Sequence, residues 1–319
     1  AGLIQGDVDF GSGYAGSTSS NVFIARTGGV LDGNLNLGGG NDTLVTSFVN
    51  DGPGQFSGIS GVVTGNGSEN LHYIIDGSVA TNVGKVGIFS RVGYDLATGS
   101  ALTLTGSAIA ADTLILAGQG RVDLTADMTG SLSDPLIRMD VASYLTDAEE
   151  QALANAVTLV SHGTLSKTIA DPDAFGAPLI AIGAGNSFEN AGTVRATGGQ
   201  YYRLTVVAGG GTMINSGVIE VRQADAFNGS FYSPYDKTKV INSGLIREAA
   251  NGDGRSRGIV NANELINSGT IDMGGTAVVY DYLVYGADLT NNGLIRSANG
   301  AAITGSYDVV SIRNEADGV

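Results

Sequence analysis

MINSGVIEV (213–221), VINSGLIRE (240–248) and LINSGTIDM (265–273) are three copies of one phrase, and the interval between them decides the fold. Two looser copies, FENAGTVRA (188–196) and LTNNGLIRS (289–297), extend the series on both sides. A repeat of about 25 residues predicts units that cannot bury a hydrophobic face alone and therefore stack. The repeated asparagines are Asn190, Asn215, Asn242, Asn267 and Asn291.

Within each copy, apolar and polar positions alternate on both sides of the Asn-x-Gly step. An apolar residue always precedes the asparagine by two positions, and a β-branched residue follows the glycine by two. This alternation predicts two short strands, and Asn with Gly predicts a turn in which Gly adopts a positive φ. The two columns are Phe188, Met213, Val240, Leu265 and Leu289, and Val194, Ile219, Ile246, Ile271 and Ile295.

Short strands, Gly and Asn corners and a fixed period together predict an all-β chain folded as a single parallel β-helix, or β-solenoid. Equivalent residues of neighbouring coils then lie about 4.8 Å apart. Stacked asparagines form a ladder of amides in such an arrangement. The charged column Arg195, Glu220, Arg247, Asp272 and Arg296 alternates in sign, which favours stacking because opposite charges on neighbouring strands attract.

The rest of the chain divides into irregular coils (1–140), a helical excursion and connection (141–185) and regular coils (186–319). Thr146 and Glu149 form a capping box that predicts a helix within 144–160. The segment 222–239, which contains Phe227, predicts a loop excursion and accounts for the longest repeat interval.

Composition limits the classes of partner. The chain has 319 residues, no Cys and a formal net charge of −15, which repels nucleic acid and anionic lipid. The absence of Cys removes disulfides and thiol chemistry. No apolar run approaches the ~18 to 20 residues of a membrane helix.

The Asn-x-Gly-x-Ile repeats, the Gly-rich strands and the lack of Cys resemble the passenger region of bacterial autotransporters, the type V secreted proteins. The resemblance covers residues 186–319 well and the first half loosely. It implies a right-handed β-helix displayed on, or released from, a Gram-negative surface, and a translocator barrel that this chain does not contain. Because the barrel is missing and the chain ends inside a repeat, we expect a fragment of a longer passenger, and the start at Ala1 is typical of a processed or trimmed chain.

Motifs for catalysis and for metal or cofactor binding are weak. His72 lies in a strand pattern, and His162 lacks the acidic and basic partners of pectin-hydrolysing β-helices. The segment 37–45 resembles one calcium repeat, but ligands for calcium come from successive copies, and a second copy is missing. We therefore expect no enzyme activity, no cofactor and no metal.

Aromatic residues supply the candidate binding site. They cluster in one sector of the coil, away from the Asn corner. We expect this aromatic sector to stack on sugars or on a protein partner. The predicted contact residues are Phe231, Tyr232, Tyr235, Tyr280, Tyr282 and Tyr285. The sequence thus predicts a surface adhesin, spacer or cell-contact module whose partner is a glycan or protein on a host or neighbouring cell, or a second copy. The alternatives are a polysaccharide lyase or hydrolase and a phage tailspike-like fibre on the same fold.

Overall fold

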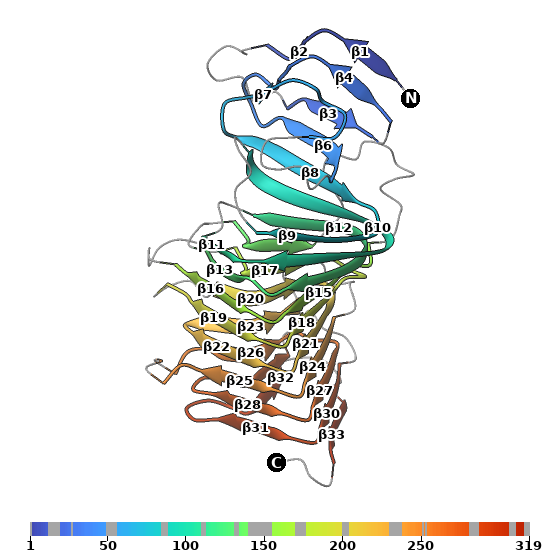
Figure 1. The fold of residues 1–319 in the computed structure, drawn as a ribbon. Helices are drawn as coiled ribbons and strands as arrows, with labels where there is room; N and C mark the ends of the chain where they lie inside the picture. Colours follow the sequence, from blue (N-terminus) through green and yellow to red (C-terminus); the bar gives the residue numbers. More distant parts are fainter. Residues whose placement is uncertain are drawn as a thin grey trace.

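The computed structural model of the protein describes residues 2–11, 20–26, 28–48, 56–83, 89–109, 113–130, 134–139, 155–169, 177–199, 204–229, 238–250, 252, 254–280, 287–305 and 311–315. Over these residues the chain is all β and forms a parallel β-solenoid without helices, as the repeat predicts. Figure 1 shows the coils stacked from the N-terminus at one end of the rod to the C-terminus at the other.

From about residue 90 each coil contributes strands to three faces, and every pairing along a face is parallel. The first face contains β3 (Val22–Ala25), β6 (Thr43–Ser47), β8 (Glu69–Ile75), β14 (Ile137–Met139), β17 (Ile180–Ile182), β20 (Leu204–Gly209), β23 (Ala224–Asn228), β26 (Arg257–Val260), β29 (Val278–Tyr280) and β32 (Ile303–Gly305). The second contains β9 (Ser78–Asn82), β15 (Thr158–Ser161), β18 (Ser187–Asn190), β21 (Thr212–Asn215), β24 (Lys239–Asn242), β27 (Glu264–Asn267), β30 (Asp288–Asn291) and β33 (Ser311–Asn314).

The third face contains β11 (Ser107–Ile109), β13 (Asp127–Gly130), β16 (Thr164–Thr168), β19 (Thr193–Thr197), β22 (Val218–Arg222), β25 (Leu245–Glu248), β28 (Thr270–Met273) and β31 (Leu294–Ser297). Two long strands, β10 (Phe89–Thr105) and β12 (Leu114–Leu124), run through both the first and the second face and join them into one sheet. The N-terminal coils add β1 (Leu3–Gln5) with β4 (Val30–Asp32), and β2 (Val8–Asp9) with β5 (Leu35–Asn36) and β7 (Val63–Thr64).

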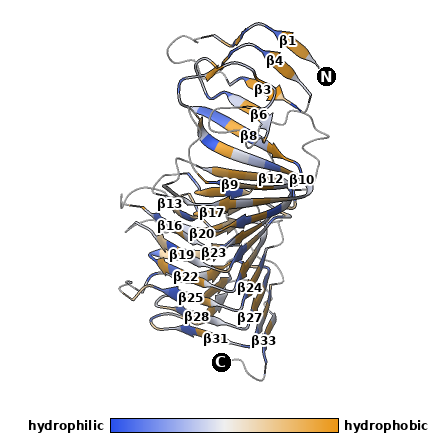
Figure 2. Ribbon diagram, in the orientation of Figure 1, coloured by the Kyte–Doolittle hydropathy of each residue, from blue (hydrophilic) through white to orange (hydrophobic). Residues whose placement is uncertain are grey.

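The core is the interior of the rod. At each inward-facing position of a face, the apolar side chains of successive coils stack into a column. The two columns predicted from the repeat are both buried. The first face contributes a third buried column, whose members pair with one another from coil to coil: Ile180, Val207, Phe227, Ile259 and Val278. Figure 2 shows hydrophobic and hydrophilic residues alternating along the strands, as the pleat requires when one side faces the core.

The charged column lies on the outside of the third face, as predicted. Arg195, Glu220, Arg247, Asp272 and Arg296 are successive partners in the parallel ladder. Ion pairs join Glu220 to Arg247 at 2.7 Å and to Arg195 at 3.7 Å, and Asp272 to Arg296. The hydrogen bond from Arg296 lowers the pKa of the Asp272 carboxyl.

The predicted boundaries change in two places. Most of the helix expected within 144–160 falls outside the described residues, but its last residues, 158–160, belong to β15. Within the span 141–185, β15, β16 and β17 are ordinary strands of the three faces, so regular stacking begins before residue 186. Likewise β23 occupies part of the expected loop 222–239. The described residues include no helix that could span a membrane. The right-handed winding stays a prediction.

Glycine is required at the corners for a different reason from the one predicted. The corner glycines Gly192, Gly217, Gly244, Gly269 and Gly293 do not have positive φ. Instead, a Cβ on Gly244 would lie 2.2 Å from the carbonyl oxygen of Gly217 in the coil below. The same contact recurs from coil to coil, so glycine is needed because neighbouring backbones approach closely.

A lysine side chain lies inside the rod. Lys167 on β16 is only 1% exposed. Its Nζ donates to the carbonyl oxygens of Asp134 at 2.7 Å and Ala177 at 2.9 Å. Burial lowers the pKa of this ammonium from its ordinary 10.5 to about 8, although the nearby Asp134 carboxylate opposes the shift.

Because of Lys167, we expect the free energy of unfolding to increase at alkaline pH. Between pH 8 and 10 the unfolded chain keeps a proton on this lysine that the folded chain releases, so the free energy of unfolding rises with pH. We expect a rise of about 2 kcal/mol in the wild type relative to Lys167→Met over this range. Urea unfolding at several pH values measures it. Parallel pH profiles for the two proteins would show that Lys167 is charged in both states.

Candidate binding face

The Asn-x-Gly corner joins the second face to the third and is fixed by a ladder of side-chain amides. Each Nδ2 donates to the Oδ1 of the asparagine in the next coil, over 2.7 to 2.8 Å from Asn190 to Asn291. Asn314 continues the ladder at 2.9 Å. The five predicted asparagines are 0 to 4% exposed. They have a structural role, because their polar atoms bind one another and the corner backbone.

The ladder determines which side chains face outward on the second face. Because the asparagine and the residue two before it point inward, the positions between and before them point to solvent. We call the outward side of β18 to β33 the isoleucine face. One of its columns is Glu189, Ile214, Ile241, Ile266, Thr290 and Arg313, and the other is Ser187, Thr212, Lys239, Glu264, Asp288 and Ser311.

The isoleucine face is flat, regular and accessible. Ile214, Ile241 and Ile266 are half-buried and lie side by side on three successive strands. A shallow groove of about 210 Å³ crosses the C-terminal part of the face and is lined by Glu264, Ile266, Asp288, Leu289, Thr290, Ser311 and Arg313. An apolar centre with a polar rim is typical of a protein contact surface.

Charge is distributed unevenly along this face. Lys239 and Glu264 form an ion pair at 3.0 Å. Glu264 and Asp288 then oppose each other on neighbouring strands, where like charges repel. At the two ends of the face, Glu189 and Arg313 form no ion pair with any described residue of the chain. The face therefore carries a free negative charge at one end and a free positive charge at the other.

The predicted aromatic site needs a correction. Tyr280 is 3% exposed and points into the core from β29, so it does not contribute to a binding surface. Burial raises the pKa of its hydroxyl, which has no hydrogen-bond partner among the described residues. Phe227 is also a core residue. Both rings follow the inward parity of their strands. Phe231, Tyr232, Tyr235, Tyr282 and Tyr285 lie outside the described residues.

The two histidines occupy different environments. His72 is buried, lies 3.6 Å from Asp95 and fills the space above Gly93, where a Cβ would be 2.4 Å from its ring. His162 is half-exposed at the corner, with Nε2 3.8 Å from Asp123, which Arg121 also binds at 2.9 Å. A general base needs a reacting group within hydrogen-bond distance. The contacts of His72 are packing contacts in the core, and those of His162 belong to a group of charged side chains on the surface.

The segment resembling a calcium repeat forms a different contact. Asp42 is buried and its Oδ1 accepts hydrogen bonds from the backbone N and the Nδ2 of Asn21, at 2.6 and 2.8 Å. Asp42 thus binds a residue of the neighbouring coil. Among the described residues, no three His, Cys, Asp or Glu side chains form a group that could hold a metal.

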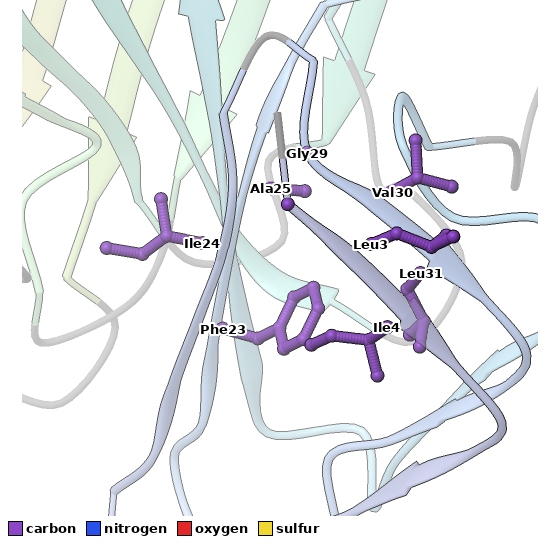
Figure 3. Close-up of a pocket in the computed structure, with 9 residues that line it drawn as sticks. Leu3, Ile4, Phe23, Ile24, Ala25, Gly29, Val30 and Leu31 are labelled. Atoms are coloured by element: carbon purple, nitrogen blue, oxygen red, sulfur yellow. The ribbon is translucent and has the colours of Figure 1, made fainter.

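A second cavity, of about 240 Å³, lies in the N-terminal coils between β1, β3 and β4 (Figure 3). Its lining consists of Gly2, Leu3, Ile4, Phe23, Ile24, Ala25, Gly29, Val30 and Leu31. Ligand pockets combine apolar walls with a few polar groups that fix orientation. Every lining side chain here is apolar, so no side chain of the cavity could orient a ligand, and the isoleucine face is the stronger candidate.

Comparisons with family models, with curated proteins and with solved structures found no match to this chain. The isoleucine face was missed in the sequence, although a signal for it is present. The residue just before each repeated asparagine is Ile in three successive copies, at a position that faces solvent by parity.

Proposed function

We propose that this chain is a rod-like contact module of the kind found in autotransporter passengers, acting as an adhesin or cell-contact spacer outside a Gram-negative cell. The observation that carries the proposal is the isoleucine face. A rigid parallel ladder holds three half-buried isoleucines and a polar rim in one plane. Such a surface binds by shape and by burial of apolar area, and needs no cofactor.

The rod supports a spacer role as well. Parallel pairing continues from coil to coil on each face, and the amide ladder and the ion pairs connect the same coils. Each coil therefore supports its neighbours, and the binding face lies on a stiff element. Rigid elements position a binding surface more accurately than loops do.

One observation favours an enzyme as the alternative. Glu264 and Asp288 are neighbours in the groove, and pairs of carboxyl groups catalyse glycoside hydrolysis. The ion pair with Lys239 opposes this function, because it already occupies the carboxylate of Glu264. Release of reducing sugar from a set of polysaccharides by the wild type, and its loss in Asp288→Asn, would support the enzyme.

Adhesion of coated beads tests the contact function. We expect beads that carry the chain to bind cell layers or one another, and beads with Ile266→Lys to lose this binding because a charge interrupts the apolar centre. The melting temperature should stay the same, since the side chain points outward. Thr168→Lys, at an exposed position on the third face, is the matched control. Equal adhesion of both variants would exclude the isoleucine face.

A further inference from the structure

The isoleucine face is complementary to itself. Along its first column the order is Glu189, Ile214, Ile241, Ile266, Thr290 and Arg313, one residue on each successive strand. When the order of the column is reversed, Arg313 takes the place of Glu189, so a positive charge replaces a negative one. The apolar centre moves by one strand, so that Ile241 and Ile266 still meet isoleucine and Ile214 meets threonine. Two copies of this face can therefore pair when one of them is reversed.

We infer that the partner of this face is a second copy of the same chain, packed antiparallel. The symmetry axis runs along the strand direction, between β24 and β27. An axis in this direction reverses the order of the coils and keeps the position along each strand, so each column meets itself. Across the interface Glu189 meets Arg313, Ile241 meets Ile266, and Ile214 meets Thr290.

The second column agrees with the same axis. Lys239 of one copy meets Glu264 of the other, and Thr212 meets Asp288, whose carboxylate accepts a hydrogen bond from the hydroxyl. The contact with Lys239 adds a positive charge beside the acidic pair Glu264 and Asp288. Coil spacing is identical in both copies, so the residue pairs stay in register along the whole face.

A parallel arrangement of the two copies lacks this match. An axis along the rod reverses the strands, and midway between the columns it brings the isoleucines onto the column of Lys239, Glu264 and Asp288. Apolar side chains would then cover the ion pair of Lys239 with Glu264 and the carboxylate of Asp288, and burying charge costs free energy. An axis over the isoleucine column instead brings Glu189 onto Glu189 and Arg313 onto Arg313, and like charges repel. The geometry therefore selects the antiparallel pair.

The interface is small, so a single pair of copies binds weakly and adhesion requires many pairs. Six strands about 4.8 Å apart and four residues long cover roughly 300–400 Å² per copy. Stable complexes bury about 800 Å² per partner, so a single pair is weak and transient. Many copies on one surface convert weak contacts into strong adhesion. Antiparallel pairing also suits rods that project from two opposed surfaces.

This inference deepens the proposed contact function and rests on it. Reciprocal charge reversal tests it. Glu189 and Arg313 form no ion pair with described residues of their own chain, so Glu189→Lys and Arg313→Glu should leave the fold and its melting temperature unchanged. Clustering of densely coated beads, and sedimentation of the free chain at high concentration, measure self-association.

We expect each variant alone to associate about tenfold more weakly than the wild type, because like charges then meet at both ends of the interface. Mixing the two variants should restore association, since both end contacts become opposite in sign. Asp76→Lys, an equal charge change at an exposed position off the face, should behave as wild type. Added salt should weaken wild-type clustering.

Two results would overturn the inference. One is a mixture of the variants that associates no better than either alone. The other is wild-type beads that bind cells but never one another, which would leave the contact function standing and remove the second copy as partner. Beads that bind neither cells nor one another would remove the contact function itself.

Discussion

Replacing Asn242 by Leu should destabilise the rod by roughly 2–5 kcal/mol, because each buried polar group left without a partner costs about 1–3 kcal/mol. The amide of Asn242 accepts from Asn215 and donates to Asn267, each within 2.8 Å. It also donates to the backbone oxygen of Thr270 at 3.3 Å. Leucine has a similar size but satisfies none of these groups. Denaturant unfolding followed by circular dichroism gives the change.

Ser243→Ala is the matched control for this ladder. Ser243 is the next residue, is exposed at the corner, and its hydroxyl makes one long contact of 3.4 Å. We expect a change below about 0.5 kcal/mol. If Asn242→Leu were as mild as this control, the amides would have to be bound by water, and the ladder would contribute nothing to stability.

Gly244→Ala should cost roughly 2–4 kcal/mol, although alanine is normally harmless in a strand or turn. The added methyl group would lie 2.2 Å from the oxygen of Gly217, and that contact is with backbone, which cannot rotate away. The two coils must separate locally, and the hydrogen bond from Leu245 to the oxygen of Gly217 must lengthen. Thermal unfolding of the variant measures the loss.

Gly2→Ala is the control for Gly244→Ala. It shows whether the loss of stability comes from the close backbone contact or from the replacement of any glycine. A Cβ at Gly2 would have no neighbour within 4 Å, and the residue does not have a positive φ. Its substitution should leave the midpoint unchanged. A Gly244→Ala protein as stable as wild type would mean that the corner can expand without loss.

The sequence predicted the elements that depend on period. Phe188, Met213 and Val240 point inward and Arg195 and Glu220 outward because the side-chain period of a strand is two, and a repeated phrase carries that parity from coil to coil. The stacked asparagines followed from the same repetition.

Features that depend on contacts between coils were not predictable in this way. The requirement for Gly244 comes from a backbone atom of the coil below, and no property of the local sequence distinguishes it from a positive-φ glycine. Tyr280 was expected at the surface because its hydroxyl is polar, whereas its strand parity places the ring in the core. Ile214, Ile241 and Ile266 were overlooked because apolar residues in a strand are first assigned to the core.

The alternating charges of the third face limit how the length of this rod can change in evolution. Deletion of one coil, residues 216–242, would bring Arg195 beside Arg247, two positive charges on neighbouring strands. Deletion of two coils, residues 216–267, would bring Arg195 beside Asp272 and preserve the alternation. Gene duplication and loss should therefore add or remove coils two at a time. Changes by an even number of coils are then favoured over changes by an odd number.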